Sequence, residues 1–221
     1  MKRIIAIGDI HGCKKTLDKM LFQQLQITKE DVIYLLGDLI DRGPDSRGVI
    51  DTILTLEKEG FTILTVLGNH EEMMLQSVLD ATSHQIWIRN GGAETLKSFE
   101  SSDFTELPME YKLFFYRAKF FIETDTNIFV HAGLNFTNEN LFEDQDAMLW
   151  VRNYHDYQPA LKNKILVHGH TPLPLRFIKN QRGNCINIDG GCVFTNWPTL
   201  GNLVAVILPD REYIFVPNVE K

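Results

Sequence analysis

The sequence of 221 residues is poor in cysteine, has no long apolar run and has no excess of positive charge. Its three cysteines, an odd number without a CxxC pair, argue against a disulfide framework or a thiolate zinc site and are typical of a reducing compartment. No apolar run approaches the roughly 18–20 residues that span a bilayer. The apolar start of the chain is too short for a signal peptide and leads into Gly8-Asp9 rather than a cleavage site. We therefore expect a cytoplasmic protein without a membrane partner.

The charge of the chain bears on its binding partners. A net charge of −7 and the absence of a Lys/Arg cluster disfavour binding to a nucleic-acid polymer, whose backbone requires several clustered basic side chains. A phosphate ligand remains compatible with this charge, because metal ions and one or two arginines can supply positive charge locally. The length and the apolar content of 44% suit a single domain, residues 1–221, and no pattern fixes an oligomeric state.

Short segments rich in Ile, Val and Leu alternate with helix-length stretches along the chain. Segments of four to six residues with many β-branched side chains are typical of buried strands. Strands are predicted at 3–7, 32–36, 62–67, 127–130, 164–167, 185–188, 203–208 and 212–216, and helices at 14–25 and 46–59. This order predicts an α/β fold, a β-sandwich of two mixed sheets flanked by helices.

The stretch 71–121 has a different pattern. It is mostly helical in its spacing, carries many aromatic side chains and is interrupted by Asn90-Gly91-Gly92. We expect it to form a helical cap insertion that rims the functional site. With few basic residues in this cap, the site is expected to be an open, shallow groove.

Polar residues follow the predicted strands where each strand ends. In open α/β sheets, ligands bind beyond the carboxyl ends of the strands, so these residues should meet at one place. Burying several carboxylates among imidazoles without a compensating charge would be very costly. Mixed carboxylate, imidazole and amide ligands suit first-row divalent ions, and a shared carboxylate would hold two of them roughly 3.5–4 Å apart. The segments concerned are Gly8-Asp9-Ile10-His11-Gly12, Gly37-Asp38-Leu39-Ile40-Asp41-Arg42-Gly43, Gly68-Asn69-His70-Glu71, His131-Ala132-Gly133 and His168-Gly169-His170.

In this order, the first four of these motifs resemble the signature of the phosphoprotein phosphatase family, within the calcineurin-like metallophosphoesterase superfamily. Its small bacterial and phage serine/threonine protein phosphatases are nearest in length, and the resemblance runs from Ile7 to about Leu208. It implies hydrolysis of phosphate monoesters by a metal-bridging hydroxide. The implied cofactors are two divalent metal ions, with manganese as the first choice and iron or zinc as alternatives.

The resemblance also implies a role for each site residue. His70 would be the general acid that protonates the leaving alkoxide, and Asp41 would orient its imidazole. Arg42 and Arg152 would bind phosphate oxygens in a forked geometry. The implied metal ligands are Asp9 and His11 for the first ion, Asp38 for both ions, and Asn69, His131 and His170 for the second.

Two positions depart from the pattern of the wider superfamily. Leu67 stands where some relatives carry an arginine, so one phosphate contact is missing or supplied elsewhere. Pro172 stands where calcineurin-like phosphodiesterases carry the second histidine of Gly-His-x-His, which favours the phosphomonoesterase branch.

Neighbouring residues carry weaker signals. Glu71 is expected to begin a helix, where an acidic side chain suits the helix dipole, and His168 is expected to hydrogen-bond near the site. The stretch 192–194 is expected to be mostly core. The stretch 187–192 is either a plain turn or a substrate-lining segment. His84 and His155 lie outside any motif and are expected at the surface.

Three functions are compatible with these motifs. Phosphoserine or phosphothreonine in proteins is the favoured substrate, with small phosphoesters also accepted. The alternative is a symmetrical bis(5'-nucleosyl)-tetraphosphatase, a dinucleoside polyphosphate hydrolase. Those relatives often carry Ala where this chain has Asp41, so the intact motif favours the protein phosphatase. A catalytically silent phosphate-binding protein is disfavoured, because every expected ligand and the His70–Asp41 pair are present.

Overall fold

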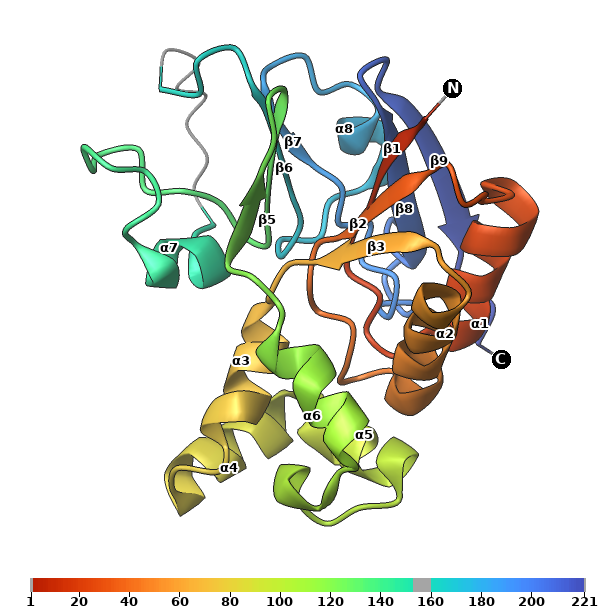
Figure 1. Ribbon diagram of the computed structural model, residues 1–221, viewed down its shortest axis with the longest axis vertical. Helices are drawn as coiled ribbons and strands as arrows, with labels where there is room; N and C mark the ends of the chain where they lie inside the picture. The colour runs from red at the N-terminus through yellow and green to blue at the C-terminus, as the bar shows by residue number, and fades with distance from the viewer. Residues whose placement is uncertain (1, 153–159, 221) are drawn as a thin grey trace.

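The computed structural model describes residues 2–152 and 160–220, and it contains two β-sheets with helices on their outer sides (Figure 1). Sheet A has the strand order β3-β2-β1-β8-β9 and sheet B the order β4-β5-β6-β7. Strands β1, β2 and β3 pair in parallel, as do β5, β6 and β7, whereas β8, β9 and β4 pair antiparallel. The strands are β1 (Ile4–Ile7), β2 (Val32–Leu35), β3 (Thr62–Thr65), β4 (Phe121–Glu123), β5 (Asn127–Val130), β6 (Ile165–His168), β7 (Cys185–Asn187), β8 (Asn202–Leu208) and β9 (Glu212–Pro217). The prediction of two mixed sheets flanked by helices is confirmed.

The helices lie close to their predicted positions. The predicted helix at 14–25 is α-helical only at its start and continues as a π-helical segment, Lys19–Gln24. Helix α2 begins at an N-cap in which the Asp45 carboxylate accepts from the Gly48 N–H at 2.8 Å. The α-helices are α1 (Lys14–Asp18), α2 (Ser46–Lys58), α3 (Asn69–Gln76), α4 (Ala81–Trp87), α5 (Ala93–Phe99), α6 (Met109–Tyr116), α7 (Gln145–Trp150) and α8 (Leu175–Ile178). Within the described ranges, no helix is long and apolar enough to cross a bilayer.

Alternation along the strands divides the core into layers. In β1, Ile5 and Ile7 pack with Leu17 of α1 and other helix residues, whereas Ala6 faces the opposite side. This division follows from the two-residue period of a strand. Between the sheets, the ring of Tyr34 from sheet A stacks on Phe129 from sheet B with centroids 3.8 Å apart. The two sheets therefore pack against each other through one apolar interface.

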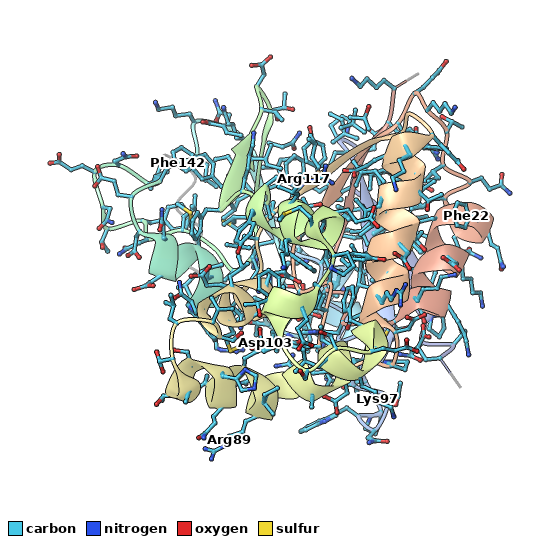
Figure 2. The ribbon with its side chains drawn as sticks, turned by 60° about the horizontal axis from the view of Figure 1, so that its bottom comes forward. Phe22, Arg89, Lys97, Asp103, Arg117 and Phe142 are labelled. Carbon is cyan, nitrogen blue, oxygen red and sulfur yellow. The ribbon has the colours of Figure 1, made fainter. Side chains whose placement is uncertain are left out.

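Helices α3 to α6 follow β3 and gather at one end of the molecule, the lower end in Figure 1. Figure 2 brings this end forward and shows Arg89 and Lys97 on its outer surface. Most of the large aromatic side chains of these helices, including Trp87 and Phe114, are buried in the same apolar cluster as the helix-facing side of β1, whereas Tyr116 is exposed. Of the two histidines without a motif, His84 on α4 is partly exposed, and His155 lies outside the described residues.

Candidate active site

The strand ends bring the predicted site residues together. Arg152 lies just after the end of helix α7, and each of the others lies after a strand or at the start of a helix; all are buried except the two arginines. A pocket of about 160 Å³ lies at this place, and His131 is buried beside it. The predicted site residues that line the pocket are Asp9, His11, Asp38, Arg42, Asn69, His70, Arg152 and His170.

The backbone at this site has an unusual conformation. Five non-glycine residues have φ in the left-handed region: His11 (47°), Asp38 (49°), Asp41 (70°), Arg42 (67°) and His170 (69°). This region is uncommon for residues with a side chain and costs about 1–3 kcal/mol at each position, so surrounding contacts must maintain it. One such contact is the His11 N–H, which donates to the Asp38 carbonyl at 2.8 Å.

Four potential ligand atoms, one of them an oxygen of Asp38, lie close together. His131 Nε2 lies 3.4 Å from Asp38 Oδ1 and 2.8 Å from Asn69 Oδ1. His170 Nδ1 lies 2.9 Å from Asn69 Oδ1 and 3.2 Å from His131 Nε2. This is a mixed carboxylate, amide and imidazole group of the kind that binds first-row divalent ions.

The hydrogen bonding of His131 shows why this group suits a cation. Its Nδ1 donates to the Leu36 carbonyl at 2.8 Å, so Nε2 is left with a bare lone pair. Burial lowers the pKa of His131 and lowers that of His170 to about 3, so both imidazoles are neutral near pH 7. The His131 lone pair therefore faces the acceptor oxygens of Asp38 and Asn69. A divalent cation between them would replace this repulsion with attraction, so these residues fit a metal ion.

The other oxygen of Asp38 faces a second group. Asp38 Oδ2 lies 3.5 Å from His11 Nε2 and 4.0 Å from His70 Nε2. His11 Nδ1 donates to the Ile40 carbonyl at 2.9 Å, so its Nε2 also carries a bare lone pair, which accepts from Arg42 Nη1 at 2.8 Å. The positively charged guanidinium of Arg42 thus already donates a hydrogen bond to the lone pair of His11 Nε2. The side chains of Asp38 and His11 therefore attract positive charge in this second group as well.

Asp9 and Asp189 add two further carboxylates to the same pocket. The pKa of Asp9 is raised by burial and then by the charges of Asp189 and Asp38, and burial raises the pKa of Asp189 to about 7. A divalent cation would favour the ionised forms of both. Asp189 belongs to the segment 187–192 and lines the pocket, which favours the substrate-lining interpretation of this segment over a plain turn.

His70 and Asp41 form a buried pair beside these groups. His70 Nδ1 and Asp41 Oδ2 are 2.7 Å apart, and both side chains are almost fully buried. Burial acts to lower the pKa of His70, but the charge of Asp38 and the hydrogen bond with Asp41 outweigh it, so this pKa is raised. The pair therefore favours a protonated imidazole whose Nε2 is directed toward Asp38.

Two aromatic rings lie at the edge of the pocket. The Arg42 guanidinium lies 5.5 Å from the ring of Phe194, and the Trp150 ring makes an edge contact with His170 at 6.0 Å between centroids. In the stretch 192–194, predicted to be mostly core, Cys192 is fully buried and Val193 packs against the core, whereas Phe194 is only partly buried and lines the pocket. Pro172 lines the same pocket, whereas Leu67 is buried.

Glu71 has a structural role that the sequence did not reveal. It lies in the first turn of α3, and its carboxylate also accepts backbone N–H groups from the strand ends that carry the site. The donors are Asp38 at 2.8 Å, Leu39 at 2.7 Å, Ile40 at 3.3 Å and Gly68 at 3.0 Å. Glu71 thus joins the end of β2 to the start of α3.

We predict that Glu71→Gln lowers the free energy of unfolding by about 2–4 kcal/mol, because one acceptor oxygen becomes an amide that faces buried N–H donors. Denaturant unfolding measures this change. Glu72→Gln is the control, because the side chain of Glu72 is partly exposed and accepts a hydrogen bond from the Gln76 amide on the same helix. Its effect should stay within about 0.5 kcal/mol. Equal changes in the free energy of unfolding for the two substitutions would contradict the structural role of Glu71.

Comparisons with known proteins agree with this geometry. Serine/threonine-protein phosphatase 1 of Salmonella typhimurium is 40% identical over 91% of this chain and 92% of its own length. The asymmetrical bis(5'-nucleosyl)-tetraphosphatase PrpE of a Geobacillus species is 30% identical over 98% of this chain and 94% of its own. A solved structure titled "Crystal structure of a putative diadenosine tetraphosphatase" superposes with a TM-score of 0.72 at 21% identity, covering 99% of this chain and 95% of that one. Residues 2–207 match the model of the calcineurin-like phosphoesterases, and the chain belongs to that family.

Proposed function

We propose that this protein is a metal-dependent serine/threonine protein phosphatase that acts in the cytoplasm. The observation that carries the choice of substrate is the buried His70–Asp41 pair, joined at 2.7 Å beside the metal-binding groups. The buried thiols of Cys13 and Cys192 are compatible with a reducing compartment.

The two groups around Asp38 would hold two divalent ions, for which manganese is the first choice and iron or zinc also suits the ligands. When bound, such ions neutralise phosphate charge and activate water as a nucleophile. Asp9, His11 and Asp38 would hold one ion. The second would lie among Asp38, Asn69, His131 and His170.

The remaining residues act on the substrate itself. The guanidinium groups of Arg42 and Arg152, both exposed at the pocket, would bind phosphate oxygens and neutralise their charge. His70 would donate its Nε2 proton to the leaving oxygen, while Asp41 holds the imidazole at Nδ1.

The chemistry of the leaving group favours a phosphorylated side chain as substrate. A serine or threonine alkoxide is strongly basic, so its departure requires a proton. A nucleotide leaving a dinucleoside polyphosphate departs as a phosphate anion that is stable at neutral pH. A dedicated proton donor is therefore of most use for an alkyl phosphate. The pocket of about 160 Å³ suits a phosphoryl group with the rest of a protein substrate outside it, since sites that enclose whole drug-sized ligands measure about 300–1,000 Å³.

A second candidate is hydrolysis of a dinucleoside tetraphosphate. It is favoured by the rings of Trp150, which is 44% exposed, and Phe194 at the edge of the pocket. An aromatic ring there could stack on a nucleobase and contribute about 1–3 kcal/mol. Relatives of both kinds resemble the chain.

The two candidates differ in one measurable ratio. With manganese present, we expect kcat/KM for a phosphothreonine peptide to exceed that for diadenosine tetraphosphate by at least about tenfold. A chelated sample is the control for metal-independent hydrolysis. The reverse ratio, with a marked loss in Trp150→Ala on the dinucleotide alone, would assign the protein to the nucleotide branch. The products would then separate symmetrical cleavage, which yields two ADP, from asymmetrical cleavage, which yields ATP and AMP.

A further inference from the structure

Asp41 is held by two side chains that come from the helical insertion. The indole N–H of Trp87 donates to both carboxylate oxygens of Asp41, at 3.1 and 3.0 Å. The hydroxyl of Thr95 donates to Asp41 Oδ1 at 2.6 Å, and its oxygen lies 2.9 Å from the Asp41 backbone nitrogen, which donates to it. Trp87 is fully buried and Thr95 is 1% exposed, so neither contact competes with bulk water.

The segment 88–92, which joins α4 to α5, packs closely around these contacts. Gly92 lies against the Trp87 indole, where an added Cβ would come within 2.5 Å of the ring. Gly91 has a φ of 112°, and its carbonyl accepts the Arg42 N–H at 3.2 Å. A Cβ at Gly91 would come within 2.7 Å of the Arg42 nitrogen. The segment 90–92 therefore packs between the indole of Trp87 and the backbone of Arg42.

These contacts stabilise the backbone conformation and the buried carboxylate of Asp41. Its backbone has a φ of 70°, which a residue with a side chain does not favour. Its carboxylate is 0% exposed, and a buried carboxylate needs hydrogen-bond donors to stay ionised. His70 supplies one donor to the carboxylate, and Trp87 and Thr95 supply two more. The orientation of the carboxylate toward His70 is thus set from α4 and α5 rather than from the strand end that carries Asp41.

We propose that Trp87 and Thr95 are positioning residues that hold Asp41 and, through it, the imidazole of His70. The helical insertion then holds His70, the proposed proton donor, in place through Asp41. This inference rests on the proposed function, in which His70 protonates the leaving oxygen.

The test uses Trp87→Phe, which keeps a buried aromatic ring and removes the N–H donor. Rates are measured with manganese on a series of phosphate monoesters, from p-nitrophenyl phosphate to alkyl phosphates with strongly basic leaving groups. We expect about a tenfold loss of kcat on the most basic leaving group, the size of one charge-assisted hydrogen bond, and little loss on p-nitrophenyl phosphate. Trp197→Phe, at a ring that is 64% exposed, is the matched control and should leave the leaving-group dependence unchanged.

A double-mutant cycle separates positioning from general damage. If Trp87 acts through Asp41, Trp87→Phe should cause no further loss of kcat in an Asp41→Asn background. An equal loss on every leaving group, or full additivity with Asp41→Asn, would overturn the inference. Should Trp87→Phe fail to fold, Thr95→Val removes another donor to the same carboxylate with little change in volume, and the same outcomes apply.

His70→Asn in the same series distinguishes this inference from the proposed function. If His70→Asn steepens the dependence on leaving group but Trp87→Phe does not, the inference alone fails. If His70→Asn leaves the dependence unchanged, the general-acid role fails and the inference fails with it.

Discussion

Replacing Asp38 by alanine is expected to remove both metal ions and to lower turnover by more than about 10³-fold, since this carboxylate would stabilise charge through both ions. Asp38 is the residue that the two candidate metal-binding groups share: one oxygen faces His131 at 3.4 Å and the other faces His11 at 3.5 Å. It also joins the end of a strand in sheet A to histidines carried by sheet B. No neighbouring carboxylate faces both groups in the described part of the chain.

Elemental analysis of the purified variant and rates with added manganese measure this effect. Asp31→Asn is a suitable control, because Asp31 is equally buried but pairs with Arg3 at 2.6 Å and does not line the pocket. Its metal content should match that of the unsubstituted protein. An Asp38→Ala variant that retains two ions, or that turns over at the full rate, would refute the two-metal assignment.

His70→Asn is expected to lower turnover by about 10²–10⁴-fold on a phosphoserine peptide while leaving the metal content intact. The imidazole of His70 lies 2.7 Å from Asp41, and its raised pKa favours the protonated form that a proton donor requires. The loss should be smaller for p-nitrophenyl phosphate, because nitrophenolate is a weak base and departs readily without a proton.

Steady-state rates on the two substrates, with metal analysis on the same samples, measure this difference. His84→Asn is the matched control, since His84 is partly exposed on α4 and does not line the pocket. A loss of the same size on both substrates would argue that His70 maintains the site rather than donating a proton.

Much of the fold and the clustering of the site followed from the sequence, because both depend on local patterns. Buried β-branched segments such as 127–130 marked the strands, and the polar residues after parallel strands such as β1 and β2 had to meet at one edge. The π-helical end of the helix at 14–25 was missed, because apolar side chains at helical spacing do not distinguish an α-helix from a π-helix over so short a segment.

The contacts that support the site could not be predicted, because they join residues far apart in the chain. Trp87 and Thr95 lie 46 and 54 residues beyond Asp41, and an aromatic side chain in a helical pattern indicates only a core. The pattern around Glu71 indicates only a helix start, whereas three of the four backbone N–H groups that it binds follow β2. Phe194 belongs to a stretch predicted to be mostly core, yet its ring lines the pocket beside Arg42.

The left-handed backbone at His11, Asp38, Asp41, Arg42 and His170 has a consequence for the adaptation of this protein. Glycine adopts that conformation without the steric cost, so the residue that best suits the local backbone is one that cannot perform the chemistry. With the roles proposed for these five side chains, stability and activity are opposed at their positions. A library of variants selected only for resistance to heat would tend to replace these side chains, whereas alternating selection for heat resistance and turnover would keep them.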